Sequence, residues 1–464
     1  MQAGHERMQV LIDTLKNRRV PVLLFLGVFL FSGLSPVGTS FDSRWTVYIA
    51  MSLWNHGDTN LDEYEPQIRE SDYYAVGCVD AQGVDHPHKA CAGHWYNGYP
   101  IGGPVLTAPL IVAAVEIMRG LHPLWVHVPA VMTLARNPDA QRVLGGFIDA
   151  DYDRAHALIE MEVASLLLAA AAVVIYFTAL LYLPSKKALL LALLFALATP
   201  AYSVAGRAIW QHTPSMLLLA ITIYLFTRAE QRPALAAWAG LPVALSYTVR
   251  PTDALFVVIF TAYVAVRHRA YLLKYLLAAT PVAIAFLAYN FSIYHFPLSP
   301  YYRTELDGFL PHHWPKLGEA LAGNLISPSR GLLVYTPVFV FAIWSMIRRS
   351  WKNPLAPWLT ALAALHWLAI SAYIASWWAG MCYGPRFFTD LTPVFVFFLI
   401  PYLERWDASS RTLRIAFVTC ALIGFAMHVR SGWSIAVHKW NVDPVSVDRH
   451  PERNWDWSDP PFLR

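Results

Sequence analysis

Long apolar runs separated by short polar turns dominate the pattern of hydrophobic and polar positions along the chain. A helix that crosses a membrane needs roughly 20 mostly apolar residues. Runs near that length are Val20–Gly38, His156–Tyr182, Ala188–Val204, Pro214–Phe226, Ala234–Tyr247, Ala254–Val266, Leu272–Phe291, Leu332–Ile347, Ala356–Ala375, Leu391–Leu403 and Leu413–Val429. Gly102–Ile117 is a shorter candidate, either a span or a re-entrant segment. The pattern therefore predicts an all-α polytopic membrane protein with about 11–13 transmembrane helices.

The composition agrees with this class. Of the 464 residues, 56% are hydrophobic and 14% are charged, whereas a soluble globular domain has roughly 25% charged residues. So little charge excludes a cytosolic Rossmann or TIM-type enzyme. The formal net charge of +4 is too small to indicate a nucleic-acid partner. Because no internal repeat or soluble segment stands out, we expect residues 1–464 to form one transmembrane domain.

Lys and Arg gather in short turns at alternate ends of the predicted helices, which is typical of cytoplasmic loops. These residues are Lys16, Arg18, Arg19, Lys186, Lys187, Arg228, Arg232, Arg267, Arg269, Lys274, Arg348, Arg349, Lys352, Arg405, Arg411 and Arg414. With these turns inside, the first helix (residues 20–38) exits outward. Three long segments, residues 39–100, 292–330 and 430–464, then lie outside. The first run is interpreted as an uncleaved span rather than a secretory signal, because it lacks an A-x-A cleavage site.

One stretch leaves the topology open. Residues 101–155 must cross the membrane an even number of times for this orientation to hold. Either Gly102–Ile117 dips in and returns, or Leu121–Ala135 makes a second crossing.

The outer segments hold most of the 18 Trp residues. Part of this excess is an interfacial aromatic belt, but a belt should occupy both faces. The remainder suits a carbohydrate site, because indole rings stack on the apolar faces of sugars. The stacking candidates are Trp45, Trp95, Trp210, Trp377 and Trp378. The first outer segment also holds Cys78 and Cys91, for which an oxidising periplasm would permit a disulfide. Two free thiols are the alternative.

Asp42 is the most informative single residue. It follows the first predicted helix in GTSFDSRW, at the outer membrane boundary. A carboxylate there can act as general base for an acceptor hydroxyl, or it can cap the amphipathic stretch that begins at Ser43. Spacing alone favours the cap. Asp62 and Glu63, further along, could orient the acceptor or raise the pKa of the first carboxylate, although a solvated turn explains them better.

The first outer segment is also weighed as a metal site. The acids and histidines of CVDAQGVDHPHKACAGHW, His88 among them, match no zinc spacing. The sequence therefore does not favour a metal there.

Four arginines stand at outer helix ends in apolar surroundings, namely Arg207, Arg250, Arg330 and Arg386. Charge so close to hydrocarbon is costly, and guanidinium groups bind phosphate through paired, charge-assisted hydrogen bonds. Each could instead reach ordinary phospholipid headgroups. Because all four lie on one face next to Pro or Gly, they favour a donor phosphate site. His212 and Tyr383 are close enough in sequence to contribute to it.

The sequence contains no P-loop, H-E-x-x-H or G-x-S-x-G motif, so an enzyme acting outside would take its donor from the membrane. The Asp after the first helix, the large outer segment and the later outer Arg and His residues resemble the GT-C superfamily of membrane glycosyltransferases. YNGYPIGGPVLTAPL, ISPSRGLLVYTPV, GMCYGPRFFTDLTPVF and NWDWSDPPF resemble a bacterial branch related to protein O-mannosyltransferases and lipid A aminoarabinose transferases.

The resemblance implies a GT-C-like bundle in the bacterial inner membrane, with its active site facing the periplasm. Asp42 would be the catalytic carboxylate, with Asp62 or Glu63 as the second acid. The enzyme would move a sugar from a polyprenyl-phosphate donor to a glycan, lipid or protein acceptor, with inversion. The outer Arg residues would hold the phosphate. We expect no required cofactor, with a divalent metal as the alternative.

Two other functions fit a membrane protein of this kind. A lipid-linked sugar flippase or transporter would typically show inverted repeats and ionisable residues at mid-membrane, and the sequence shows neither. An O-antigen ligase or polymerase would place its main outer loop late in the chain, whereas here the longest outer segment is the first.

Overall fold

The computed structural model describes residues 19–39, 41–87, 89–125, 138–307, 316–348, 352–373 and 376–464. The predicted basic residues Lys16, Arg18 and Arg349 lie outside the described residues, as do His88 and most of Leu121–Ala135.

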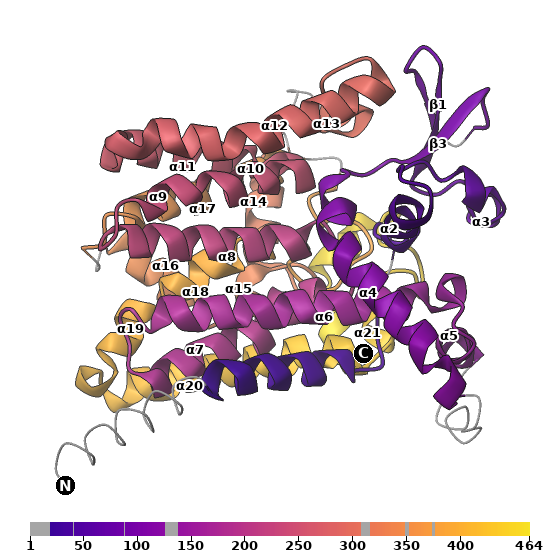
Figure 1. The fold of residues 1–464 in the computed structure, drawn as a ribbon. Coiled ribbons are helices and arrows are strands. Elements are labelled where there is room, and N and C mark those ends of the chain that lie inside the picture. Colours follow the sequence, from indigo (N-terminus) through magenta and orange to yellow (C-terminus); the bar gives the residue numbers. More distant parts are fainter. Residues whose placement is uncertain are drawn as a thin grey trace, which may run out of the picture.

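Most of the described chain is helical, and its longer helices run side by side as a bundle (Figure 1). Their hydrophobic side chains share one extended core. Helices are the expected form of these runs, because every backbone N–H and C=O in an apolar environment must be paired within the protein. The bundle contains the helix Arg19–Gly33 and α6 (Tyr152–Ala179), α7 (Ser185–Leu197), α8 (His212–Ala229), α9 (Leu235–Trp238), α10 (Gly240–Val249), α11 (Ala254–Arg267), α12 (Leu272–Tyr294), α15 (Leu332–Tyr335), α16 (Phe339–Ile347), α17 (Ala356–Ala372), α18 (Thr392–Phe397), α19 (Ile400–Glu404) and α20 (Arg411–Trp433).

Four helices of the described chain are long and apolar enough to cross a membrane, namely Gly102–Leu124, Tyr152–Ala179, Arg269–Tyr294 and Arg411–Trp433. Shorter apolar helices are Arg19–Gly33, Leu235–Val249, Ala356–Ala372 and Thr392–Glu404. These helices are compatible with a helical membrane protein, and the larger number of crossings stays a prediction.

Several predicted runs are divided into two helices, and proline accounts for two of the divisions. The run 332–347 separates into α15 and α16 around Pro337, and the run 391–403 separates into α18 and α19, whose first turn contains Pro401. Proline lacks the N–H that a helix interior needs and suits the first turn instead. Apolar runs therefore locate the helical regions better than they locate individual helices.

The first outer segment folds into a lobe at one end of the bundle (Figure 1). It contains α2 (Thr46–Asn55), η1 (Asp62–Tyr64), α3 (Glu65–Glu70) and a three-stranded antiparallel sheet of order β2-β1-β3. The strands are β1 (Val76–Asp80), β2 (Asp85–Pro87) and β3 (Gly93–Asn97). The chain is mostly helical, as predicted, and this sheet is a small addition that the hydrophobic pattern of the segment does not predict.

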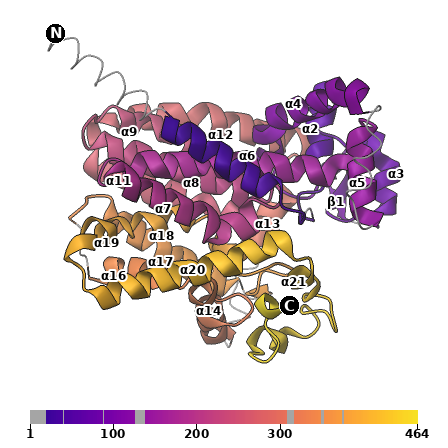
Figure 2. The same cartoon turned by 90° about the horizontal axis from the view of Figure 1, so that it is seen from below.

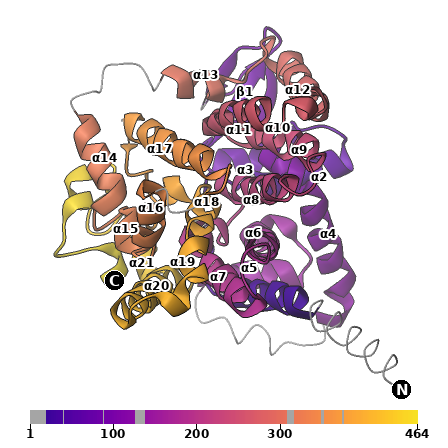
Figure 3. The same ribbon diagram turned by 90° about the vertical axis from the view of Figure 1, so that its left-hand side faces the viewer.

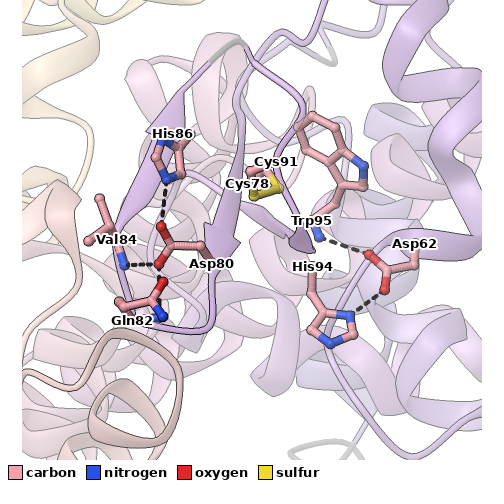
Figure 4. The surroundings of a disulfide bond; sticks show 9 residues. All are labelled: Asp62, Cys78, Asp80, Gln82, Val84, His86, Cys91, His94 and Trp95. Carbon is pink, nitrogen blue, oxygen red and sulfur yellow. Dashed lines mark hydrogen bonds and ion pairs between the residues drawn. A yellow bond between two sulfur atoms is a disulfide. The ribbon is translucent and has the colours of Figure 1, made fainter.

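A disulfide between Cys78 and Cys91 joins β1 to the residues that precede β3 (Figure 4). Cys78 lies opposite His86 on one side and Trp95 on the other. The bridge is part of a small hydrophobic core of the lobe that also contains Trp45, Tyr48 and Trp95. Strand pairing, the cross-link and this core together fix the lobe.

The stretch with open topology forms α4 (Gly102–Trp125) and α5 (Pro138–Ile148). Helix α4 runs steeply oblique to α6 and α8, and it packs against α2 and α6 (Figures 1 and 3). It continues beyond the predicted Gly102–Ile117 to Trp125, with Pro109 and Pro123 inside the helix.

The C-terminal residues after α20 form α21 (Ala436–Lys439), η10 (Pro451–Trp455) and η11 (Pro461–Leu463). This tail lies beside α14 (Leu317–Ile326), which follows α13 (Pro300–Asp307) in the chain (Figure 2). The Ser329 hydroxyl donates a hydrogen bond to Asn454 Oδ1 at 2.7 Å, so the tail is fastened to the second outer segment.

Candidate functional site

A cavity of about 420 Å³ opens where the lobe, the bundle and the tail meet. Its wall combines Asp42 and Tyr74 from the lobe with the start of α8, the Arg250 turn, the segment before α18 and Asp448 of the tail. Ligand pockets for small molecules typically have volumes of roughly 300–1,000 Å³, so the cavity is large enough for a sugar and a phosphate group.

Asp42 faces this cavity with its side chain 18% exposed. Arg386 Nη2 donates to Asp42 Oδ2 at 2.5 Å, and the Tyr74 hydroxyl donates to Asp42 Oδ1 at 2.7 Å. Helix α2 begins at Thr46 with Trp45 as its N-cap and no side-chain cap. The helix-capping role that spacing favours for Asp42 is therefore wrong, and its carboxylate is committed to the cavity.

Asp42 is held in its ionised form. Burial alone would raise the pKa of its carboxyl, but the charge of Arg386 and the hydroxyl groups of Tyr74 and Tyr99 outweigh burial and hold the pKa below its ordinary value. Burial and the adjacent Asp42 charge raise the pKa of the Tyr74 hydroxyl well above its ordinary value. Tyr74 therefore stays a hydrogen-bond donor at neutral pH.

Behind Asp42, Arg386 continues into a polar network on the cavity floor. Its guanidinium lies 4.0 Å over the Trp210 ring, and its Nε donates to His212 Nε2 at 3.4 Å. His212 Nδ1 lies 3.3 Å from Asp390 Oδ1, and Arg250 Nη1 forms an ion pair with Asp390 Oδ2. Arg250 Nη1 also lies 2.9 Å from His212 Nδ1, so this ring nitrogen contacts both members of the buried ion pair. Arg250, His212 and Arg386 thus form one connected set, with Asp390 behind them.

Two buried carboxylates escape the sequence analysis. Asp390 and Asp253 are both fully buried, and Asp253 Oδ2 accepts a hydrogen bond from the Ser215 hydroxyl at 2.6 Å. The signal was present in the same motifs, because each acid follows a cavity arginine closely, in RPTD and RFFTD. A buried arginine needs a counter-charge nearby. An acid within four residues of such an arginine is therefore a candidate for its ion-pair partner, and this signal could have identified both residues.

Arg330 does not line the cavity, and the structure gives it a different role from the predicted phosphate contact. Its guanidinium donates to the carbonyl oxygens of Trp378 (2.7 Å), Gly380 (3.0 Å) and Ser329 (3.1 Å) and to Asn441 Oδ1 (2.8 Å). It therefore joins the tail to the segment that carries Arg386.

Arg207 and Tyr383 are likewise placed away from the cavity. Arg207 is fully buried and donates to the Ser32 carbonyl at 2.9 Å and to the hydroxyls of Ser32 and Ser35, so it secures the first helix. The Tyr383 hydroxyl donates to the Met427 carbonyl at 2.8 Å. Neither residue stands among those that line the cavity.

Asp62 and Glu63 lie in the lobe and do not join Asp42. Asp62 accepts from the Trp95 backbone N–H at 2.8 Å and contacts His94 Nδ1 at 2.5 Å (Figure 4). Glu63 lies 3.9 Å from His56. The cavity supplies Tyr74 and Tyr99 in the place where the sequence analysis expected a second acid.

The predicted stacking tryptophans are dispersed. Trp210 lines the cavity, whereas Trp45 and Trp95 belong to the lobe core. Trp377 is buried with its Nε1 3.3 Å from Glu319 Oε1, and Trp378 Nε1 donates to Asp448 at 2.8 Å. Trp378 therefore contacts Asp448 of the cavity wall without lining the cavity itself.

Among the described residues, no group of three or more His, Cys, Asp or Glu side chains is placed to hold a metal ion. The comparisons with known proteins identify no family, since no protein-family model and no curated protein matches the chain.

Proposed function

We propose that the protein is a glycosyltransferase of the GT-C type, which moves a sugar from a polyprenyl-phosphate donor to a glycan, lipid or protein acceptor. The reaction would take place at the periplasmic face of the bacterial inner membrane. The observation that carries the proposal is the cavity that unites Asp42 with Arg250, Arg386 and His212 at the end of an apolar helical bundle.

The chemistry follows from these groups. Asp42 is ionised, so it can take the proton of an acceptor hydroxyl as general base. The acceptor oxygen attacks the anomeric carbon while the bond from that carbon to the phosphate oxygen breaks. The electron pair of the broken bond stays on the phosphate, whose growing charge the guanidinium groups of Arg250 and Arg386 stabilise. One displacement inverts the anomeric centre.

The surroundings of the cavity suit a donor that combines a sugar, a charged phosphate and an apolar chain. Trp210, Tyr74 and Tyr99 offer aromatic faces and hydroxyls for a sugar, and the phosphate would meet the two arginines. The apolar helices, which are compatible with a membrane, provide the environment in which a polyprenyl chain remains.

The test is a transfer assay in membrane vesicles that contain the overproduced protein and radiolabelled polyprenyl-phosphate sugars. We expect Asp42→Asn to lower transfer into the lipid, glycan or protein fraction by about 10²–10⁴-fold, which is the usual worth of a general base. The matched control is Asp149→Asn, which removes an exposed carboxylate paired with Arg154 and should leave transfer unchanged.

Wild-type turnover by Asp42→Asn would contradict the mechanism. Movement of the intact lipid-linked sugar across the vesicle membrane, with no covalent product, would instead identify a flippase.

A further inference from the structure

We propose that Arg386 is shared between Asp42 and the donor phosphate, so that binding of a phosphate-bearing lipid frees Asp42 to accept a proton. The inference rests on the proposed function and gives its order of events. The base is inactive while it is paired with Arg386, and the donor activates it.

The two cavity arginines differ in their counter-ions. Arg250 is paired with Asp390, which is fully buried behind the cavity floor. Arg386 is paired with Asp42, which itself lines the cavity. A phosphate that draws Arg250 away would leave a buried charge unpaired, at a cost of several kcal/mol. A phosphate that draws Arg386 away leaves a carboxylate that can take up a proton.

The remaining contacts of Arg386 favour a short movement rather than a loss of its position. Its guanidinium stays over the Trp210 ring at 4.0 Å and near His212 Nε2 at 3.4 Å. Neither contact involves the Nη2 atom that bonds Asp42. A ligand oxygen in the cavity can therefore compete for Nη2 while Trp210 and His212 hold the rest of the group.

The charge balance of the transfer step fits a shared counter-ion. Before transfer, the carboxylate of Asp42 and the phosphodiester of the donor each carry one negative charge. Afterwards the acceptor proton is on Asp42, which is neutral, and the released phosphate monoester carries the second charge. The total is unchanged, and the charge that needs Arg386 has moved from Asp42 to the phosphate.

Other groups around Asp42 do not reproduce this exchange. Tyr74 and Tyr99 face it from the lobe as neutral hydroxyls, and Ser43 beside it is bonded to Glu160 on α6 at 2.6 Å. Arg250, His212 and Asp448 lie elsewhere in the cavity wall. Among the charged side chains that the structure describes, Arg386 makes the direct contact with Asp42.

The experiment measures protons taken up when the full-length protein in detergent binds a prenyl phosphodiester whose second ester is methyl. This probe cannot transfer a sugar and does not titrate near neutral pH. Calorimetry in buffers of different ionisation enthalpy, at about pH 5, which is roughly one unit above the ordinary pKa of Asp, gives the proton count. Dimethyl phosphate and the prenol without phosphate are the parallel ligands.

We expect the wild-type protein to take up a fraction of a proton per bound lipid and Asp42→Asn to lose that uptake. Arg386→Gln should also lose the proton uptake, because in this variant Asp42 has no counter-ion for the lipid to displace. The matched control Arg250→Lys keeps a charge for Asp390 but loses the guanidinium fork. It should bind about tenfold or more weakly while taking up as many protons per bound lipid as the wild type.

Five results would overturn the inference. Binding without proton uptake, or equal uptake by Asp42→Asn, refutes the exchange while leaving the phosphate site of the proposed function intact. Failure of the phosphodiester to bind refutes both. Equal proton uptake with dimethyl phosphate assigns the site to a free phosphate ester instead of a lipid. Equal proton uptake with the prenol shows that the phosphate does not cause the uptake.

Discussion

Arg330 offers the sharpest test of which predicted phosphate-binding arginines have a structural role instead. The sequence predicts that Arg330 contacts phosphate, whereas in the structure it joins the tail to the segment before α18. Its side chain is 1% exposed. Three of its hydrogen bonds reach Trp378, Gly380 and Asn441, which belong to other segments. A hydrogen bond to a charged group contributes about 1.5–3 kcal/mol. In Arg330→Met the desolvation cost of the charge disappears as well, so we expect a net loss of about 3 kcal/mol.

The loss should be local, because the bonds of Arg330 join the segment before α18 to the tail. Hydrogen–deuterium exchange of the detergent-solubilised protein would measure it. A loss of about 3 kcal/mol corresponds to roughly hundredfold faster exchange in peptides that cover residues 379–384 and 438–442, with α6 unchanged. Arg348→Met is the control, since Arg348 is an exposed residue that lies 4.2 Å over the Trp344 ring. We expect it to cost at most about 1 kcal/mol.

The contrary result is equally specific. If Arg330→Met exchanged like the wild type but bound the prenyl phosphodiester more weakly, Arg330 would be a ligand-binding residue and the structural argument would be wrong.

Three further predictions concern the lobe and the cavity. Replacing Cys78 and Cys91 together by Ser removes a cross-link between residues 13 apart and should lower the opening free energy of the sheet by about 3 kcal/mol; unchanged amide exchange in β1 would contradict this. Trp210→Leu removes the ring under Arg386 and should weaken binding of the prenyl phosphodiester by about 0.5–2 kcal/mol, with Trp210→Phe closer to wild type; equal affinities in all three proteins would exclude the contact. The pKa of Asp42 lies below its ordinary value in the free site, so kcat/KM should fall only when the pH drops into that low range, whereas the kcat of the donor complex should begin to fall at higher pH; coincident acid limbs would show that the donor leaves Asp42 paired.

The class of the protein was predictable because hydropathy is a property of local sequence. Apolar runs located the helical regions from Val20 to Val429. The sheet was not predictable in the same way, because β2 is only Asp85–Pro87 and β3 contains Gly93, His94 and Asn97, which have little strand preference. Their pairing depends on β1 and on the disulfide, which are features of the folded lobe.

The site was predicted in part for a related reason. Asp42 and Arg386 were singled out one by one, and the structure brings them into contact. Arg330 and Arg386 look alike in sequence, since both are arginines next to Gly or Pro at a helix end. They differ in the groups that accept their hydrogen bonds. The guanidinium of Arg330 donates to distant carbonyls such as that of Trp378, whereas the guanidinium of Arg386 donates to a carboxylate in the cavity. No local pattern encodes that choice.

The cavity wall joins Asp42 near one end of the chain to Asp448 near the other, and 344 residues separate Asp42 from its counter-ion Arg386. During synthesis, an unfinished chain that stops before residue 386 has Asp42 without its counter-ion, however many helices have already formed. Such a chain should be silent rather than partly active. Under the proposed function, a donor lipid would find its binding site only on a protein whose later helices are in place.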